Sequence, residues 1–266
     1  MNFFDAVLLG IVEGITEFLP ISSTAHLMMT SKILGLAQSE FVKSFEIVIQ
    51  LGAITAVILL FGKRLFEQTQ IWKKVCIAFI PTAVIGFLLY KIIKDYLIGN
   101  LSIMVWTLII GGLVLIAVEY FFFKYKPGID SETPQKLSDM GSISNTKAFW
   151  IGVCQAVSVV PGVSRAAATI IPAIFFGASR QAAAEFSFLL AIPTVAAAAG
   201  YDLFKNYSVI SFSSNFTLLA TGVIVSVLAA IVGIKFMVSF LSKHSLTSFG
   251  LYRILVAIVF FLLFLN

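Results

Sequence analysis

The run LSIMVWTLIIGGLVLIAV at residues 101–118 contains no charged residue. At 1.5 Å per residue an 18-residue helix is about 27 Å long, close to the roughly 30 Å hydrocarbon core of a bilayer. The whole chain shares this character, since 59% of its 266 residues are hydrophobic, 12% are charged and the mean hydropathy is +1.02. A soluble domain carries about a quarter charged residues. The sequence therefore predicts an integral membrane protein with several spanning helices.

Composition excludes several other classes of protein. Disordered chains are poor in aromatic residues and rich in charge, whereas this chain has 26 Phe. Its two cysteines, Cys76 and Cys154, lie in apolar stretches and form neither a disulfide framework nor a metal-binding spacing. No basic cluster is interleaved with aromatic residues, so we expect no nucleic-acid partner.

Ten apolar segments are expected along the chain. Four of them are short or interrupted and form two pairs, each joined by a turn that contains a proline, Pro20 or Pro161. Pairs of this kind are typical of re-entrant hairpins, whose broken backbone is tolerated at membrane depth only where protein or a wet cavity satisfies it. The four short segments are 2–19, 23–35, 148–160 and 162–177, and the six expected to span the membrane are 44–61, 75–93, 101–123, 182–203, 215–241 and 246–265.

The two halves of the chain resemble each other. Each half contains one hairpin and three spanning helices, and this odd number places the second half in the opposite orientation. The predicted fold class is thus an all-α polytopic membrane protein, with about six transmembrane helices and two re-entrant hairpins arranged as an inverted repeat in one domain, 1–266. The repeats cover about 1–123 and 148–266, and a polar linker, 124–147, joins them. The matching positions are Glu13 with Gln155, Pro20 with Pro161, and Glu46 with Glu185.

Basic residues predict the orientation of the chain, because cytoplasmic loops carry an excess of Lys and Arg. Ten basic residues lie on the face that includes the linker and five lie on the other face, so we expect the first face to be cytoplasmic. We therefore expect a multi-pass protein of the inner (plasma) membrane with both termini on the outer side. The ten residues are Lys63, Arg64, Lys73, Lys74, Lys124, Lys126, Lys136, Lys147, Arg180 and Lys243, and the five are Lys32, Lys43, Lys91, Lys94 and Lys205.

The first hairpin carries two carboxylates on one helix face. Glu13 and Glu17 are four residues apart, and acids inside an apolar helix are costly and usually functional. Two ionised carboxylates this close repel each other unless a cation lies between them, and oxygen ligands suit Mg²⁺ or Ca²⁺. Hydroxyl side chains at 22–24 then open the next helix, and His26 follows one turn later. These residues predict a divalent-cation site beside a proton-transfer group.

The second hairpin has the composition of an anion site. Gly162 permits a close backbone approach, Ser164 opens a helix whose free N–H groups attract an anion, and Arg165 adds a planar fork of donors. Thr169 follows one turn later. In an inverted repeat the two hairpin turns meet at the midplane, so the sequence predicts a phosphate site that both hairpins build.

The motifs Glu13-x-x-x-Glu17-Phe-Leu-Pro-x-Ser-Ser-Thr-x-His26 and Pro161-Gly-x-Ser-Arg165 resemble the undecaprenyl-diphosphate phosphatase family, also called bacitracin-resistance proteins. The stretches 45–52 and 185–190 are similar to that family too, so that the resemblance covers nearly the whole chain. It implies a membrane phosphatase that hydrolyses the isoprenoid diphosphate carrier of cell-wall synthesis to the monophosphate on the outer leaflet. A divalent cation is implied as well.

By position, the resemblance carries the catalytic roles to residues of this chain, and the other roles follow from the residue patterns above. Where the family motif usually continues Ser-Arg-Ser, this chain has Ala166, so one hydroxyl contact to phosphate is absent. The implied partners are the lipid diphosphate and membrane lipid, and a homodimer is left open. The catalytic residues are Glu13, Glu17, Ser23, His26 and Arg165; the substrate-binding residues are Ser22, Thr24, Gly162, Ser164 and Thr169; the supporting residues are Glu46, Gln50 and Glu185; and the metal ligands are Glu13 and Glu17.

Plainer explanations exist for several of these residues. The glutamates and Arg165 can form a structural ion pair, His26 can be a satisfied interior histidine, and the hydroxyls at 22–24 can be helix caps. We expect Glu46 and Glu185 to hydrogen-bond exposed backbone of the hairpins. Glu119, at the end of an expected helix, should extend to the membrane interface.

Two other functions compete with the phosphatase. Inverted repeats and broken helices are typical of transporters, so a transporter or flippase for an anionic or lipid phosphate substrate is the alternative. Four reactive residues gathered in one hairpin favour hydrolysis over transport. A lipid phosphatase of the acid-phosphatase-like type is rejected, because the chain lacks a Pro-Ser-Gly-His motif and Ser164-Arg165 is not followed by the histidine that this type requires.

Thiol labelling of intact cells tests the predicted orientation. With Cys76 and Cys154 replaced, Lys32→Cys and Lys43→Cys should react with an impermeant reagent added outside, and Lys136→Cys should not, since the excess of basic residues marks its face as cytoplasmic. The reverse pattern would contradict both the topology and the side of the reaction.

Overall fold

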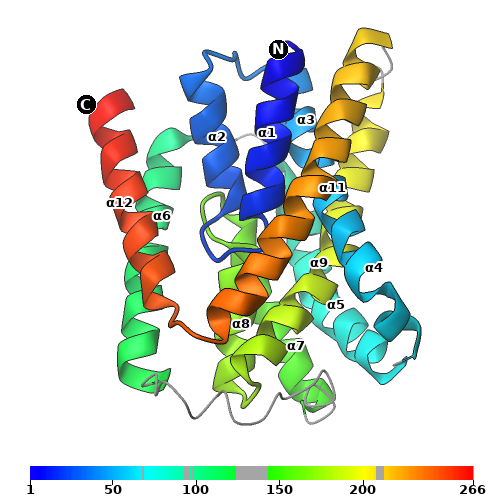
Figure 1. The fold of residues 1–266 in the computed structure, drawn as a ribbon, viewed down its shortest axis with the longest axis vertical. Coiled ribbons are helices and arrows are strands. Elements are labelled where there is room, and N and C mark those ends of the chain that lie inside the picture. The colour runs from blue at the N-terminus through cyan, green and yellow to red at the C-terminus, as the bar shows by residue number, and fades with distance from the viewer. Residues whose placement is uncertain (68, 93–95, 98, 124–142, 208–212, 266) are drawn as a thin grey trace.

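A computed structural model of the chain describes residues 1–67, 69–92, 96–97, 99–123, 143–207 and 213–265, so residues 124–142 of the predicted linker lie outside the described part. Every regular element in the described part is helical (Figure 1). The elements are α1 (Phe3–Thr16), α2 (Ser23–Ile33), α3 (Glu40–Val48), α4 (Gln50–Glu67), α5 (Thr69–Ile92), α6 (Leu101–Val118), the π-helix η2 (Glu119–Phe123), α7 (Asn145–Gln155), the 3₁₀-helix η4 (Ala156–Val159), α8 (Arg165–Phe175), α9 (Arg180–Lys205), α11 (Ser213–Leu241) and α12 (Thr247–Phe264).

Six helical stretches of the described chain are long and apolar enough to cross a membrane, which confirms the six predicted spans. The first begins at Glu40 rather than at 44, because the Ser39 side chain accepts a hydrogen bond from the Val42 backbone N–H and caps the helix four residues earlier. It is divided at Ile49 into α3 and α4. The stretches are Glu40–Gly62, Gln70–Leu89, Leu101–Phe122, Arg180–Lys205, Phe216–Leu241 and Thr247–Phe264.

The four short helices form two hairpins, α1–α2 and α7–α8. In Figure 1 the first hairpin occupies the end of the bundle that carries both termini, the second occupies the opposite end, and their turns meet between them. The Ser164 hydroxyl of the second turn donates to the Leu19 carbonyl oxygen of the first at 3.4 Å. The expected break at each proline turn is thus present.

Helix packing is reciprocal between the halves. Helix α1 of the first half packs on α11 of the second, α7 of the second packs on α5 of the first, and α6 packs on α12. This exchange is the pattern that the predicted inverted repeat requires. The repeat itself, and the re-entrant character of the hairpins, stay predictions.

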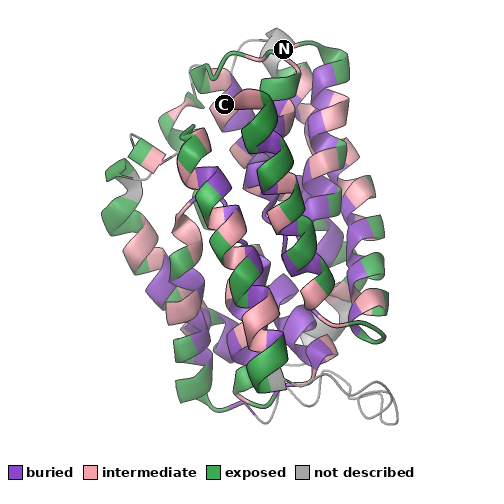
Figure 2. Cartoon of the chain, turned by 90° about the vertical axis from the view of Figure 1, so that its left-hand side faces the viewer, coloured by how far each residue is buried: buried purple, intermediate pink, exposed green. Residues whose placement is uncertain are grey.

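Apolar side chains cover the outside of the bundle as well as its core. Figure 2 shows exposed residues along the full length of the outer helices, and many are large hydrophobics, such as Phe87, Trp106 and Leu255. Inside, the largest cluster of buried apolar residues includes Phe18, which meets Phe188 edge to face at 5.1 Å between ring centroids. An apolar exterior of this kind suits a lipid environment.

Glu119 does not extend to the interface, and that expectation was wrong. Its side chain is 4% exposed and forms a two-pronged ion pair with Arg180 at the start of α9. One of its oxygens also accepts the Leu246 backbone N–H at 3.1 Å, just before α12 begins. The carboxylate therefore joins η2, α9 and α12 at the end of the bundle opposite the termini (Figure 1).

Breaking this buried pair should destabilise the protein strongly. We expect Glu119→Leu to lower the free energy of unfolding in mixed micelles by about 3–5 kcal/mol, because the buried Arg180 loses its two-pronged carboxylate partner. The double variant Glu119→Leu/Arg180→Met should regain part of that loss. As the control, Glu40→Gln removes an exposed partner of Lys43 and should cost about 0–1 kcal/mol. Equal losses for Glu119→Leu and Glu40→Gln would contradict the role of the pair.

Candidate active site

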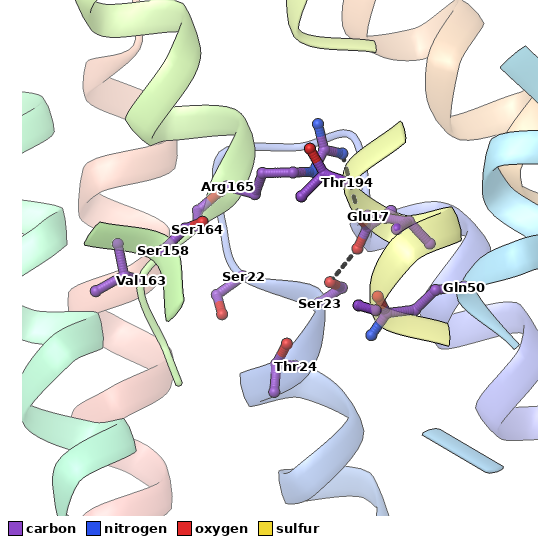
Figure 3. A pocket seen from close by; sticks show the side chains of 12 residues that line it. Glu17, Ser22, Ser23, Thr24, Gln50, Ser158, Val163, Ser164, Arg165 and Thr194 are labelled. Atoms are coloured by element: carbon purple, nitrogen blue, oxygen red, sulfur yellow. Dashed lines mark hydrogen bonds and ion pairs between the residues drawn. The ribbon is translucent and has the colours of Figure 1, made fainter. Parts of the chain in front are cut away.

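Glu17 lies at the centre of a pocket where the two hairpin turns meet. It follows the last residue of α1 and is 7% exposed. One carboxylate oxygen accepts the Ser23 hydroxyl in a short hydrogen bond, and the other accepts Arg165 Nη2 at 3.1 Å (Figure 3). One carboxylate thus joins a hydroxyl of the first hairpin to the cation of the second.

Arg165 is the first residue of α8 and points across the pocket toward Glu17 (Figure 3). Its Nη1 donates to the Ser187 carbonyl oxygen at 2.8 Å, and its guanidinium lies 5.8 Å from the centroid of the Phe18 ring. The buried Nε has no hydrogen-bond partner in the described part of the chain. Arg165 is therefore held at two points and keeps a donor for an anion.

The pocket collects hydroxyl groups and two helix N-termini. It has a volume of about 140 Å³, and both Ser23 and Arg165, the first residues of α2 and α8, line it. Free N–H groups at a helix start attract anions. The remaining lining residues are Glu17, Ser22, Thr24, Gln50, Ser158, Val163, Ser164, Thr194, Val195 and Ala198.

Ser22 has an unusual backbone conformation, with φ 71° and ψ 94°. It is the only non-glycine residue with positive φ in the described ranges. Its hydroxyl accepts the Ala25 backbone N–H at 3.4 Å, as a helix cap does. Strained residues of this kind cluster at functional sites, where the surrounding structure holds them in place.

Glu13 is fully buried next to this pocket. Neither of its carboxylate oxygens accepts a hydrogen bond from a residue that the structure describes. Of the charges close to it, those of Glu17 and Glu46 repel it and that of Arg165 attracts it. A buried carboxylate with Glu17 beside it and an excess of negative charge around it fits either a proton shared by the two acids or a divalent cation between them.

A family model and several relatives match this chain. The model is described as "Bacitracin resistance protein BacA" and covers residues 6–259. The chain belongs to this family. A protein of Aquifex aeolicus named undecaprenyl-diphosphatase is 49% identical over 266 residues, the whole length of both chains. Proteins with the same name from Persephonella marina and Wolinella succinogenes are 46% and 43% identical over 98% of this chain and 99% and 97% of their own length.

His26, which the family motif includes, lies outside the pocket lining in this member. Its Nδ1 lies 2.8 Å from the Ser22 carbonyl oxygen, so Nδ1 carries a proton and donates. Its Nε2 lies 2.9 Å from the Tyr252 hydroxyl of α12, and the two rings are stacked. Both ring nitrogens are thus engaged, and the group beside Ser23 is Glu17 rather than His26. A proton-transfer role for His26 stays a prediction.

Two residues of the second hairpin are placed for structure rather than for contact with the pocket. Gly162 has φ +90°, and a Cβ there would lie 1.9 Å from Thr107 Oγ1, so glycine is needed for the turn to approach α6. Thr169 is fully buried and donates to the Ser187 hydroxyl at 2.6 Å. Neither lines the pocket. Ala166, where the family usually has Ser, is also fully buried in the apolar core.

The three expected supporting residues lie in different parts of the structure. Gln50 lines the pocket, and Glu46 accepts the Ser31 hydroxyl of α2 at 2.6 Å. Glu46 thus holds the first hairpin through a side chain rather than through the exposed backbone that we expected. Glu185 accepts Gln181 Nε2 at 3.2 Å and lines a different hollow, between α4, α9 and α11.

Sequence reasoning missed several residues of the site. Ser158 and Thr194 line the pocket. From α12, Tyr252 contacts His26, and Arg253 donates to carbonyl oxygens of both hairpin turns. Isolated hydroxyls in apolar helices carry no distinctive signal. Arg253 did carry one, because a charge in the middle of a spanning helix usually marks a functional site.

Proposed function

We propose that this protein hydrolyses undecaprenyl diphosphate to undecaprenyl phosphate and phosphate, which recycles the lipid carrier of cell-wall synthesis and confers resistance to bacitracin. The observation that carries the proposal is the Glu17 carboxylate, which binds the Ser23 hydroxyl of one hairpin and the Arg165 guanidinium of the other. Membership of the family and the name shared by the relatives support the same reaction. They favour it over the transporter or flippase alternative.

The pocket residues divide the chemistry between the hairpins. Arg165 and the N-termini of α2 and α8 bind the phosphate oxygens and stabilise the negative charge that develops on them. Glu17 accepts the proton of the group that attacks phosphorus. That group is the Ser23 hydroxyl, which already donates to Glu17, or a water held in its place. In both cases the bond between the attacked phosphorus and the bridging oxygen breaks, and the lipid monophosphate leaves. Attack by water releases phosphate directly, whereas attack by Ser23 leaves a phosphoserine that a water molecule then hydrolyses to release phosphate.

A divalent cation, Mg²⁺ or Ca²⁺, is part of the proposal, with Glu13 and Glu17 as its protein ligands. No group of three or more His, Cys, Asp or Glu side chains converges as a ready metal site in the described chain. The remaining ligands would therefore be phosphate oxygens and water, which Mg²⁺ commonly keeps. When bound, the cation would neutralise charge on the diphosphate.

We also propose that the pocket is reached from the outer face of the plasma membrane. The hairpin that carries Glu17 and Ser23 lies at the same end of the bundle as both termini (Figure 1). The excess of basic residues assigns that end to the outer side. A lipid diphosphate on the outer leaflet would then meet the pocket directly.

Phosphate release by the purified protein tests the reaction. Undecaprenyl diphosphate and a C15 diphosphate should both yield phosphate, and a chelator should stop the release. Glu17→Gln keeps the size of the side chain and should abolish most of the activity, since it removes the proton acceptor of Ser23. Folded wild-type protein that releases no phosphate with either substrate would overturn the proposed function.

Arg165→Lys should be severely impaired. Lysine keeps the charge but cannot contact the Ser187 carbonyl, Glu17 and an anion with one planar fork. We expect a loss of about 2–3 kcal/mol of transition-state stabilisation, or roughly 30- to 150-fold in kcat/KM. Arg180→Lys is the matched control, because the Arg180 side chain is also shielded, at 7% exposed against 10% for Arg165, but pairs with Glu119 and does not line the pocket. Near wild-type turnover of Arg165→Lys would contradict the role of Arg165.

The dependence of activity on metal concentration should differ between variants of Glu13 and Glu17. Glu13→Gln should fold and should need far more metal to reach half of its maximal activity, because it loses a charged ligand. Glu17→Gln should show the same shift and a lower maximum, since it also loses the contacts to Ser23 and Arg165. Activity is titrated against metal for both variants and the wild type. Unchanged metal dependence in both variants would mean that the acids are not ligands.

A further inference from the structure

Arg253 is the largest fully buried side chain of the described chain. It lies within α12, an 18-residue apolar helix, and is 1% exposed. A charged side chain at membrane depth is costly and is retained where it has a partner or a function. No carboxylate among the described residues forms an ion pair with it. The hydrogen bonds of its guanidinium must therefore explain why Arg253 is buried here.

The partners are backbone carbonyl oxygens of three separate segments. Arg253 Nη1 donates to Pro20 at 3.2 Å in the turn of the first hairpin. Its Nη2 donates to Gly162 at 2.9 Å in the turn of the second hairpin. Nη2 and Nε also donate to Thr107 at 3.0 Å and Leu108 at 3.3 Å in α6. One guanidinium thus binds both hairpin turns and a spanning helix.

The two turns need such a donor. A helix satisfies its own carbonyl groups, whereas a broken backbone in an apolar interior leaves them without partners, at a cost on the order of several kcal/mol for each group in hydrocarbon. A guanidinium offers five N–H groups in one rigid plane and can reach carbonyls in different directions. Lysine has three donors on a single atom and cannot bridge the same span.

The turns held by Arg253 are those that carry the pocket residues. Pro20 lies three residues from both Glu17 and Ser23, and Gly162 lies three residues from Arg165. The distance between the two turns sets the distance between Glu17 and Arg165. Arg253 itself does not line the pocket.

We propose that Arg253 is a positioning residue that clamps the two hairpin turns together and so aligns Glu17 and Ser23 with Arg165. The proposal rests on the proposed phosphatase activity for its kinetic consequence, but its structural consequence is independent of that activity. Gly111 in α6 supports the clamp, because a Cβ at this position would lie 2.2 Å from Arg253 Nη2. Only glycine leaves room for the guanidinium.

Kinetics of folded, purified variants test the alignment. Arg253→Met should lower kcat about 10²-fold, since a small misplacement of reacting groups has an effect of this order, while KM changes little. Arg253→Lys should retain more activity than Arg253→Met, because it keeps some of the donors. Arg180→Met is the control: it removes another buried arginine and should lower stability without lowering kcat. Wild-type kcat for folded Arg253→Met would overturn the proposal.

Hydrogen–deuterium exchange provides a readout that needs no activity. Backbone amides in 17–24 and in 160–166 should exchange faster in Arg253→Met than in the wild type, and the rest of the bundle should change little. Arg180→Met should leave both turns protected. Unchanged protection of the turns in Arg253→Met, or a uniform loss over all helices, would overturn the clamp. If the wild type releases no phosphate, the proposed function fails and this measurement still decides the role of Arg253.

A third variant displaces the guanidinium without removing it. Gly111→Ala should lower kcat and loosen both turns, as Arg253→Met does, because the added methyl group occupies the space of Nη2. Gly86→Ala is the matched control, since no atom lies within 4 Å of a Cβ at that position of α5. Equal kcat and equal exchange for the two alanine variants would contradict the proposal even if Arg253→Met does not fold.

Discussion

Helices α1 and α7 end, and helices α2 and α8 begin, in the interior of this bundle. The polar backbone groups at those helix termini must find partners within the protein. Water cannot supply them in an apolar interior, and each group left alone is costly. The structure meets this constraint with side chains. Ser22 and Ser164 accept N–H groups at the starts of α2 and α8, and Thr107 donates to the Pro161 carbonyl at 2.8 Å. The same caps leave hydroxyls and helix N-termini facing one pocket.

The second consequence of broken helices is electrostatic. Several charged side chains are buried in the described chain, and they differ in how they are satisfied. Glu119 and Arg180 satisfy each other at one end of the bundle, which makes that pair structural. Glu13 near the hairpin turns is different, because its two oxygens have no donor among the described residues. An unsatisfied buried carboxylate is destabilising by itself, and the proposed cation would offset that cost when it binds.

The two hairpins have similar shapes but different chemistry. Gln155, which the predicted repeat matches with Glu13, donates to the hydroxyls of Thr82 and Thr194 at 2.8 and 3.2 Å. An amide in this place ties α7 to α5 and α9 without adding charge. The carboxylates lie in the first hairpin and Arg165, the proposed anion-binding residue, lies in the second, so neither hairpin alone would form the proposed site. This division explains why the turns must be held close together.

Much of this protein could be predicted from the sequence because it depends on local composition. Apolar runs of helical length determined the six candidate spans, Pro20 and Pro161 determined the two breaks, and the acids at 13 and 17 with Arg165 indicated an anion and metal site. Membership of the bacitracin-resistance family followed from the same short motifs. These features need only the neighbours of each residue along the chain.

Tertiary structure alone decided which side chains meet. It paired Ser23 with Glu17 and His26 with Tyr252, 226 positions away in the chain. It also buried Thr169 against Ser187, away from the pocket. Arg253 is the clearest case, since an arginine in an apolar helix indicates a partner but not which one. Partners of buried polar groups are selected by distance and geometry between helices, and a linear sequence contains neither until the chain has packed.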